Sequence, residues 1–154
     1  MRVLSIDPGL NPGLVELDET GRVWRATHLP HPDWLRSCVW DIAATEGQWY
    51  YDPKPGAARK NINNILTLAF RAGFMLGQVN ALRYCRVSPQ EWRALYGGGA
   101  LRKEQVQRKI AAELTAPERV LFQSIPRARH GDVLDAIGIG RAVLRNPAKY
   151  EWKR

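Results

Sequence analysis

Cysteine is scarce in this chain of 154 residues, which contains only Cys38 and Cys85. Two well-separated cysteines supply neither a disulfide framework nor the closely spaced thiols of a zinc site. Both lie in apolar-rich stretches, so we expect two buried free thiols in a protein of a reducing compartment.

A long hydrophobic run is also missing. The most apolar segment, 62–82, is interrupted by polar residues that include Asn63, Asn64, Arg71 and Gln78, so it is not expected to span a membrane. The first apolar run, 3–6, is too short for a signal peptide and ends at an acid. The triple glycine at 97–99 lacks the Lys-Ser/Thr that follows in a nucleotide-binding P-loop. We therefore expect a cytoplasmic protein without membrane association.

Acidic residues are outnumbered by basic ones, 15 against 23, which gives a net charge of +8. Such a balance favours a polyanionic partner, nucleic acid first, although a basic protein without that function remains an alternative. Hydrophobic residues make up 45% of the chain, enough for a packed core, and the length predicts a single domain over 1–154 with a basic tail at about 145–154.

Hydrophobic periodicity and turn residues predict an α/β protein. We expect strands at 2–7, 13–18, 23–28, 39–45 and 83–87; helices at 60–82, 89–96, 101–114 and 132–144; a connection at 29–37; and a turn-rich basic segment at 116–130. This order, with hairpin strands first and a crossover later, predicts a five-stranded mixed sheet with helices on both faces. Within the long helix, Ala69, Gly73 and Gly77 form a small-residue stripe that we expect to pack closely against a sheet or helix.

Two predicted strands end in a carboxylate, Asp7 and Glu46, and the last helix begins with Asp132 and Asp135. Each acid also has an explanation without catalysis. Asp7 could be a turn residue, Glu46 a charge at a strand end, and the pair at 132 and 135 could cap the helix and favour its positive end. However, Asp135 precedes an apolar helix rich in small residues, so it is expected to face the sheet and to need a partner. Four such acids together would repel one another unless cations lay between them.

Hard cations such as Mg²⁺ bind carboxylates and substrate phosphates, and two of them can activate a water and stabilise the leaving oxygen of a phosphodiester. A basic chain with this acid cluster is therefore interpreted as a metal-dependent nuclease.

Four motifs carry a resemblance to a known family. They are Ile6-Asp7-Pro8-Gly9, Thr45-Glu46, Gly97-Gly98-Gly99-Ala100 followed by Lys103-Glu104-Gln105-Val106, and Asp132-Val133-Leu134-Asp135-Ala136. In order and approximate spacing, the sequence resembles the RuvC family of Holliday junction resolvases, within the RNase H-like superfamily, over nearly its whole length. The compact form is similar to phage-type members.

The resemblance implies an RNase H-like fold, a homodimer and paired symmetric nicks in four-way DNA junctions. It implies two Mg²⁺ ions per active site, with Mn²⁺ possible, held by the catalytic acids Asp7, Glu46, Asp132 and Asp135. Lys103 falls on the family's basic residue near the scissile phosphate, with a solvated helix lysine as the alternative. We take the helix at 60–82 as part of the dimer face.

DNA-binding residues are predicted from the same resemblance. Trp49 lies where the family places an aromatic wedge, and Tyr50 and Tyr51 compete for that role. Arg102 is also predicted to bind DNA. Where the family has a second lysine, this sequence has Trp92 and Arg93, and Arg93 is predicted to substitute for that lysine. His130 could ligate a metal or shuttle a proton, but a surface histidine is the alternative. The segment 52–56 departs from the family pattern.

Other functions remain open at this point. A broader branched-DNA nuclease, a non-catalytic branched-DNA-binding module and an RNase H acting on RNA–DNA hybrids all fit the same fold. An actin-like phosphotransferase also begins with a strand, an acid and a glycine turn, but it needs two such lobes, and this chain supplies one.

Overall fold

The computed structural model describes residues 1–47, 58–97 and 101–150, with side chains of the helix after the first gap described from residue 64 onward. Its strands are β1 (Arg2–Asp7), β2 (Gly13–Asp18), β3 (Val23–Thr27), β4 (Val39–Glu46) and β5 (Asn80–Val87). Its helices are α1 (Asp33–Ser37), α2 (Ala58–Leu76), α3 (Pro89–Ala94), α4 (Lys103–Glu113), α5 (Ala116–Gln123) and α6 (His130–Arg145), with short 3₁₀ turns at Arg127–Arg129 and Pro147–Tyr150.

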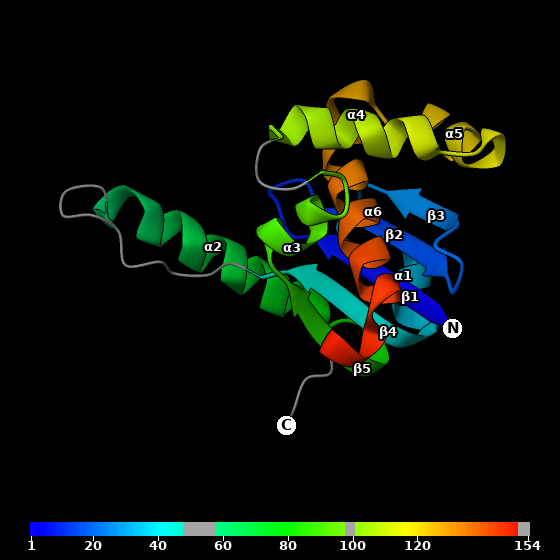
Figure 1. Cartoon of the computed structure of the whole chain (residues 1–154). Helices are drawn as coiled ribbons and strands as arrows, with labels where there is room; N and C mark the ends of the chain where they lie inside the picture. Colours follow the sequence, from blue (N-terminus) through cyan, green and yellow to red (C-terminus); the bar gives the residue numbers. More distant parts are fainter. Residues whose placement is uncertain (48–57, 98–100, 151–154) are drawn as a thin grey trace.

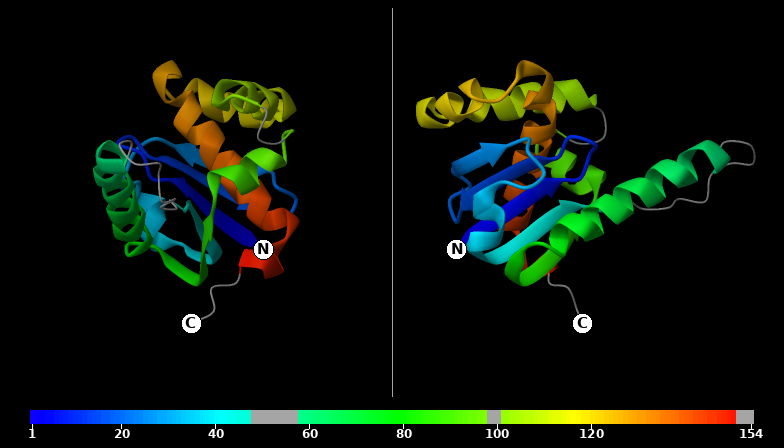
Figure 2. Two further views of the ribbon diagram at one scale, coloured as in Figure 1. Left: turned by 60° about the vertical axis from the view of Figure 1, so that its left-hand side comes forward. Right: turned by 180° about the vertical axis from the view of Figure 1, so that it is seen from behind.

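The five strands form one mixed sheet in the order β3-β2-β1-β4-β5. The hairpin strands β1, β2 and β3 pair antiparallel, whereas β4 lies parallel to β1 and to β5. Helices α3 to α6 lie on one side of this sheet and α1 lies on the other, next to the base of α2 (Figures 1 and 2). The α/β fold expected from the sequence, a five-stranded mixed sheet with helices on both faces, is therefore confirmed.

Two hydrophobic clusters follow from the alternation of side chains along each strand. On one face of the sheet, Val3 and residues of β2 to β5 pack against α3, α4, α5 and α6. On the other face, Leu4 and Ile6 pack against α1 and the last turn of α2. Cys85 is buried in the first cluster as expected, but Cys38 is only partly buried. None of the described helices combines the length and apolarity of a membrane span.

The end of the long helix was predicted wrongly. α2 ends at Leu76, and its final turn tightens, since the amides of Gln78 and Val79 donate to carbonyls only three residues back. Residues 80–82 belong to β5, where Asn80 pairs with Val39 of β4. Sheet pairing outweighs the helical pattern there.

The turn-rich segment predicted at 116–130 was also wrong, because it contains α5. Thr115 caps this helix reciprocally with Glu118: its amide and its hydroxyl donate to Glu118 Oε2 at 2.7 and 2.8 Å. The last helix begins at His130 and not at Asp132, so Asp132 is not its N-cap.

The prediction that the small residues of α2 pack closely against a sheet or helix is wrong within this chain. Ala69, Gly73 and Gly77 are exposed, and a Cβ added to Gly73 would meet no atom within 4 Å. Glycines elsewhere in the chain allow helix and sheet to approach closely. A Cβ on Gly13 would overlap the carbonyl of Asp132, so the start of α6 lies directly against the start of β2.

We predict that Gly13→Ala lowers the free energy of unfolding by about 1–3 kcal/mol, because the added methyl must push α6 off the sheet. The matched control is Gly9→Ala, where the new Cβ would lie at an ordinary 3.5 Å from the Asn11 carbonyl. Urea unfolding followed by circular dichroism measures both. Equal stability of the two variants would contradict the close packing of α6 on β2.

Candidate metal and nuclease site

Asp7 and Glu46 reach the same edge and the same face of the sheet. β1 and β4 are parallel neighbours in which Ile6 pairs with Thr45, so the acids that follow are adjacent at the carboxyl ends of the two strands. Along β1, Asp7 shares its face with Ser5, whose hydroxyl donates to the Ala136 carbonyl of α6 at 2.6 Å. Both acids therefore lie on the side of the sheet that α6 covers.

α6 brings the other two predicted acids to this edge. Asp132 lies in its first turn, against Gly13, and is partly exposed. Asp135, one turn further on, is only 1% exposed. The structure thus gathers one acid from β1, one from β4 and two from α6, and the spacing of three residues keeps the α6 pair on one face.

Electrostatic coupling shows how close these acids are. Burial, followed by the negative charges of Asp135 and Glu46, raises the pKa of Asp7 to about 8, while Lys103 acts in the opposite direction. Burial also raises the pKa of Asp132, against the positive charges of Lys103 and Arg129. Asp7 and Asp132 are therefore both coupled to the negative charge of neighbouring acids, with Lys103 as the opposing positive charge.

Lys103, at the start of α4, supplies positive charge directly to the cluster. Its Nζ lies 2.5 Å from Asp135 Oδ2, and the side chain remains 45% exposed. Burial lowers the pKa of Lys103, but the hydrogen bond and charge of Asp135 outweigh that effect and raise it. The lysine is therefore a charged partner of the buried acid.

Gln107 is a site residue that the sequence reasoning missed. Its Nε2 donates to Asp135 Oδ1 at 2.9 Å and to the Gly131 carbonyl at 3.2 Å. It lies four residues after Lys103, so both side chains project from one face of α4. Once Lys103 is predicted to lie at the acids, the spacing of four residues predicts that Gln107 lies there too.

Trp92 is the second missed residue. Its indole Nε1 donates to Glu46 Oε2 at 3.1 Å, and the side chain is fully buried. The sequence marked Trp92 only as a departure from a family pattern. No local signal indicates a contact between residues 46 positions apart.

The donor set fits a hard divalent cation, since it offers carboxylate oxygens around a buried, undercompensated acid. As the side chains are placed, however, no three His, Cys, Asp or Glu residues in the described segments form a ready-made metal site. The amine of Lys103 lies against Asp135 at this position. The catalytic and metal-binding roles of the five predicted residues stay predictions.

Of the predicted DNA-binding residues, the described part of the chain includes Arg93, Arg102 and Lys103. Arg102 is exposed before α4, and Arg93 is half-buried with its guanidinium 5.1 Å from the ring centre of Trp92. Trp49, Tyr50 and Tyr51 lie outside the described residues. Their wedge role stays a prediction.

His130 has a structural role at the start of α6. Its Nε2 lies 2.9 Å from the Ile125 carbonyl and 3.2 Å from the Phe122 carbonyl. Its ring also meets Phe122 edge-on, at 5.3 Å between centroids. Because both partners are acceptors, Nε2 carries the proton, and the ring ties α5 to α6.

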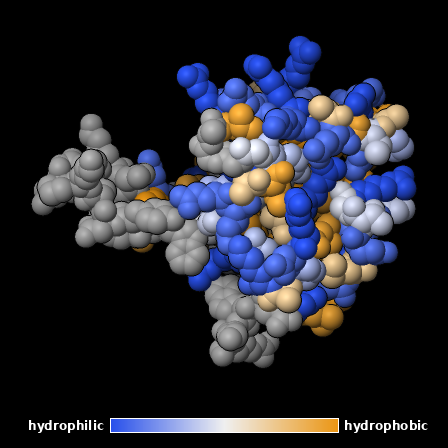
Figure 3. All heavy atoms as spheres, in the orientation of Figure 1, coloured by the Kyte–Doolittle hydropathy of each residue, from blue (hydrophilic) through white to orange (hydrophobic). Residues whose placement is uncertain are grey.

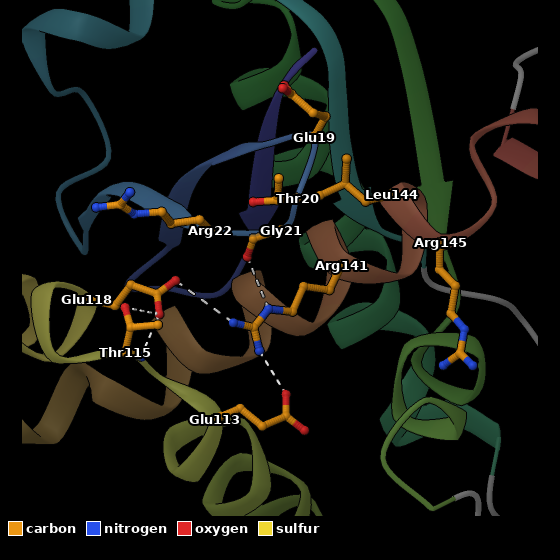
Figure 4. A pocket seen from close by; sticks show the side chains of 10 residues that line it. All are labelled: Glu19, Thr20, Gly21, Arg22, Glu113, Thr115, Glu118, Arg141, Leu144 and Arg145. Atoms are coloured by element: carbon orange, nitrogen blue, oxygen red, sulfur yellow. Dashed lines mark hydrogen bonds and ion pairs between the residues drawn. The ribbon is translucent and has the colours of Figure 1, made fainter.

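A cavity of about 590 Å³ lies at the other end of the sheet, beside the β2–β3 turn. Arg141 dominates it: its guanidinium lies 2.9 Å from Glu113 and 3.9 Å from Glu118, and its Nε donates to the Gly21 carbonyl (Figure 4). These charges compensate one another and join α4, α5 and α6 to the turn. The cavity does not contribute to the acid cluster.

No protein-family model and no curated protein sequence matches this chain. Among solved structures, the chain is similar to RuvC of Thermus thermophilus, with 22% identity and a TM-score of 0.49 over 98% of both chains. It is also similar to T. thermophilus RuvC in complex with a Holliday junction substrate, with 19% identity and a TM-score of 0.49 over 98% of this chain and 99% of that one. Similarity of this size does not establish a shared activity, so the function proposed below depends on the residues of this chain.

The raised pKa of Asp7 predicts a pH-dependent stability of the metal-free protein. An unfolded Asp7 loses its proton near its ordinary pKa of 3.8, whereas the folded one keeps it up to about pH 8. Because the folded state binds more protons in this window, the free energy of unfolding falls as pH rises from about 4 to 8. We expect Asp7→Asn to raise that free energy by about 1–3 kcal/mol at pH 7 and to flatten the slope.

The matched control is Asp33→Asn, which removes an exposed acid at the start of α1. Urea unfolding in EDTA at several pH values measures the effect. If Asp7→Asn is no more stable than Asp33→Asn across this window, Asp7 does not lie in an undercompensated acid cluster.

Proposed function

We propose that this chain is a divalent-cation-dependent endonuclease of branched DNA, which resolves four-way (Holliday) junctions by paired symmetric nicks. The observation that carries the proposal is the convergence of four carboxylates on one sheet edge, with Asp7 held at a pKa of about 8. A protein that only binds DNA has no need for buried acids that repel both one another and the phosphates.

Asp7, Glu46, Asp132 and Asp135 would hold two Mg²⁺ ions per site, with Mn²⁺ as a substitute. Divalent ions at such a site supply an activated water and balance the charge on the leaving oxygen of a phosphodiester. Asp135, on α6, is buried, whereas Asp7, at the end of β1, is partly exposed. Asp132 is also partly exposed, and we take its side of the cluster as the one from which a phosphate approaches.

The protein's own contribution to phosphate binding centres on Lys103. Its amine is charged, half-exposed and already among the acids, so a short movement away from Asp135 Oδ2 would bring it to a phosphate oxygen. Gln107 would keep Asp135 oriented through Oδ1 during that exchange.

Positive charge around the acids supports DNA as the substrate class. Arg102 directly precedes α4, and Arg127 and Arg129 lie in the 3₁₀ turn just before α6, whose first turns carry Asp132 and Asp135. Hydrophilic side chains protrude over α4 on the face shown in Figure 3. Contacts of these residues with phosphates make binding salt-dependent. Trp49, with Tyr50 as its competitor, is proposed to stack on bases at the junction centre.

A second copy of the chain suits a substrate that needs two symmetric cuts. α2 projects from the sheet (Figure 1) and exposes a stripe of large apolar side chains, with Phe70 74% and Phe74 56% exposed, next to the small residues Ala69 and Gly73. This stripe is our proposed dimer face, since large exposed aromatics are costly in an isolated chain.

Cleavage of a synthetic four-way junction tests the function, with a flap, a plain duplex and an RNA–DNA hybrid alongside, with and without Mg²⁺. We expect symmetric Mg²⁺-dependent nicks in the junction. We expect Asp7→Asn to slow cutting at least about 100-fold while junction binding persists, since it removes a carboxylate that the ions need. Asp33→Asn is the matched control and should cut normally.

The other substrates separate the alternatives. Cutting of junction and flap together would indicate a broader branched-DNA nuclease, and cutting of the hybrid alone would indicate an RNase H. Junction binding without any cutting would replace the enzyme by a binding module.

Dimerisation through α2 is tested by sedimentation. We predict that Phe70→Glu converts the dimer to a folded monomer with an unchanged circular dichroism spectrum, since the ring is exposed within one chain. Val120→Glu is the control, because Val120 is also exposed, at 59%, but lies on α5. A wild-type protein that sediments as a monomer at micromolar concentration, or a Phe70→Glu dimer, would contradict this face.

A further inference from the structure

Glu46, one of the four acids of the cluster, accepts a hydrogen bond from an indole. Trp92 Nε1 donates to Glu46 Oε2 at 3.1 Å. This partner is neutral, whereas Asp135 bonds the charged amine of Lys103. A neutral N–H fixes the orientation of a carboxylate and leaves its negative charge in place for a cation.

The indole itself is held on several sides. α3 begins with a capping box in which the Glu91 amide donates to Ser88 Oγ at 3.2 Å and the Ser88 amide donates to Glu91 Oε2 at 2.8 Å. On α6, Gly138 leaves room for the ring, since a Cβ there would lie 2.7 Å from Trp92 Cε3. Trp92 is fully buried as a result.

The backbone around Glu46 is fixed as well. Glu46 pairs with Val87 at the end of β5, and the Gly47 amide donates to the Val87 carbonyl at 2.8 Å. β5 leads within two residues into α3. The acid and its indole donor are therefore attached to the same pair of strand ends, and their separation is set by the fold.

We propose that Trp92 is a positioning residue that orients the Glu46 carboxylate for divalent-cation binding, a role that rests on the proposed nuclease function. A free glutamate side chain loses rotamer freedom when it ligates an ion, and this entropic cost opposes binding. The indole hydrogen bond already restricts the Glu46 side chain in the folded protein, so less rotamer freedom is lost when an ion binds. Trp92 does not touch substrate, so it acts only through Glu46.

The experiment replaces Trp92 with benzothienylalanine, which keeps the shape of the ring but has sulfur in place of the N–H. The matched control is the same replacement at Trp40, which is equally buried and lies on the same strand as Glu46. The Trp40 Nε1 has no hydrogen-bond partner in the described part of the chain. Calorimetric titration of the DNA-free protein with Mg²⁺ measures affinity.

We expect the replacement at Trp92 to weaken Mg²⁺ binding about 10- to 100-fold, and the one at Trp40 to leave it unchanged. Junction cleavage by the Trp92 variant should be slow at low Mg²⁺ and recover at high Mg²⁺, with an unchanged KM for DNA. Nuclear magnetic resonance of ¹⁵N-labelled tryptophan adds a second readout: Mg²⁺ should shift the indole signal of Trp92 but not that of Trp40.

Each failure has its own signature. If wild-type protein binds Mg²⁺ and the two replacements have equal effects, Trp92 is a core residue only, and the inference is overturned while the nuclease proposal stands. If wild-type protein binds no Mg²⁺ and cuts no substrate, the proposed function falls, and the role of Trp92 falls with it.

Discussion

Repulsion between buried carboxylates is the constraint on which the account of this protein depends. Asp7, Glu46 and Asp135 lie close enough that burial and their mutual charge raise the pKa of Asp7 to about 8. A core does not gain stability from such a cluster, because each uncompensated acid is costly away from water. The arrangement has a physical rationale if positive charge from outside the chain completes it. Lys103 supplies only part of that charge.

The packing of α6 on the sheet produces this proximity. Gly13 and Gly140 leave no room for a Cβ between α6 and the strands, and the Ser5 hydroxyl bonds the Ala136 carbonyl within the same contact. Any change that lifts α6 therefore also separates Asp135 from Asp7. The stability of the core and the geometry of the site are consequences of one interface.

Much of this arrangement was accessible from the sequence. Apolar runs that end in an acid predicted β1 and β4, and parallel neighbours place their carboxyl ends at one edge. The end of α2 was not predictable from periodicity, because pairing with β4 decides that residues 80–82 are a strand. α5 was predictable but overlooked, since Thr115 and Glu118 form a capping box. The contacts of Trp92 and Gln107 with the acids arise from packing between distant segments, which no local pattern specifies.

We expect the four acids to form one cation site. A crystal structure of the protein soaked in Mn²⁺, with anomalous scattering used to locate the ions, tests this. Anomalous density should lie in contact with Asp7 and with Glu46 or Asp135, and the Lys103 amine should have left Asp135. Crystals that show no density among the acids at saturating Mn²⁺, with Lys103 still on Asp135, would contradict this expectation.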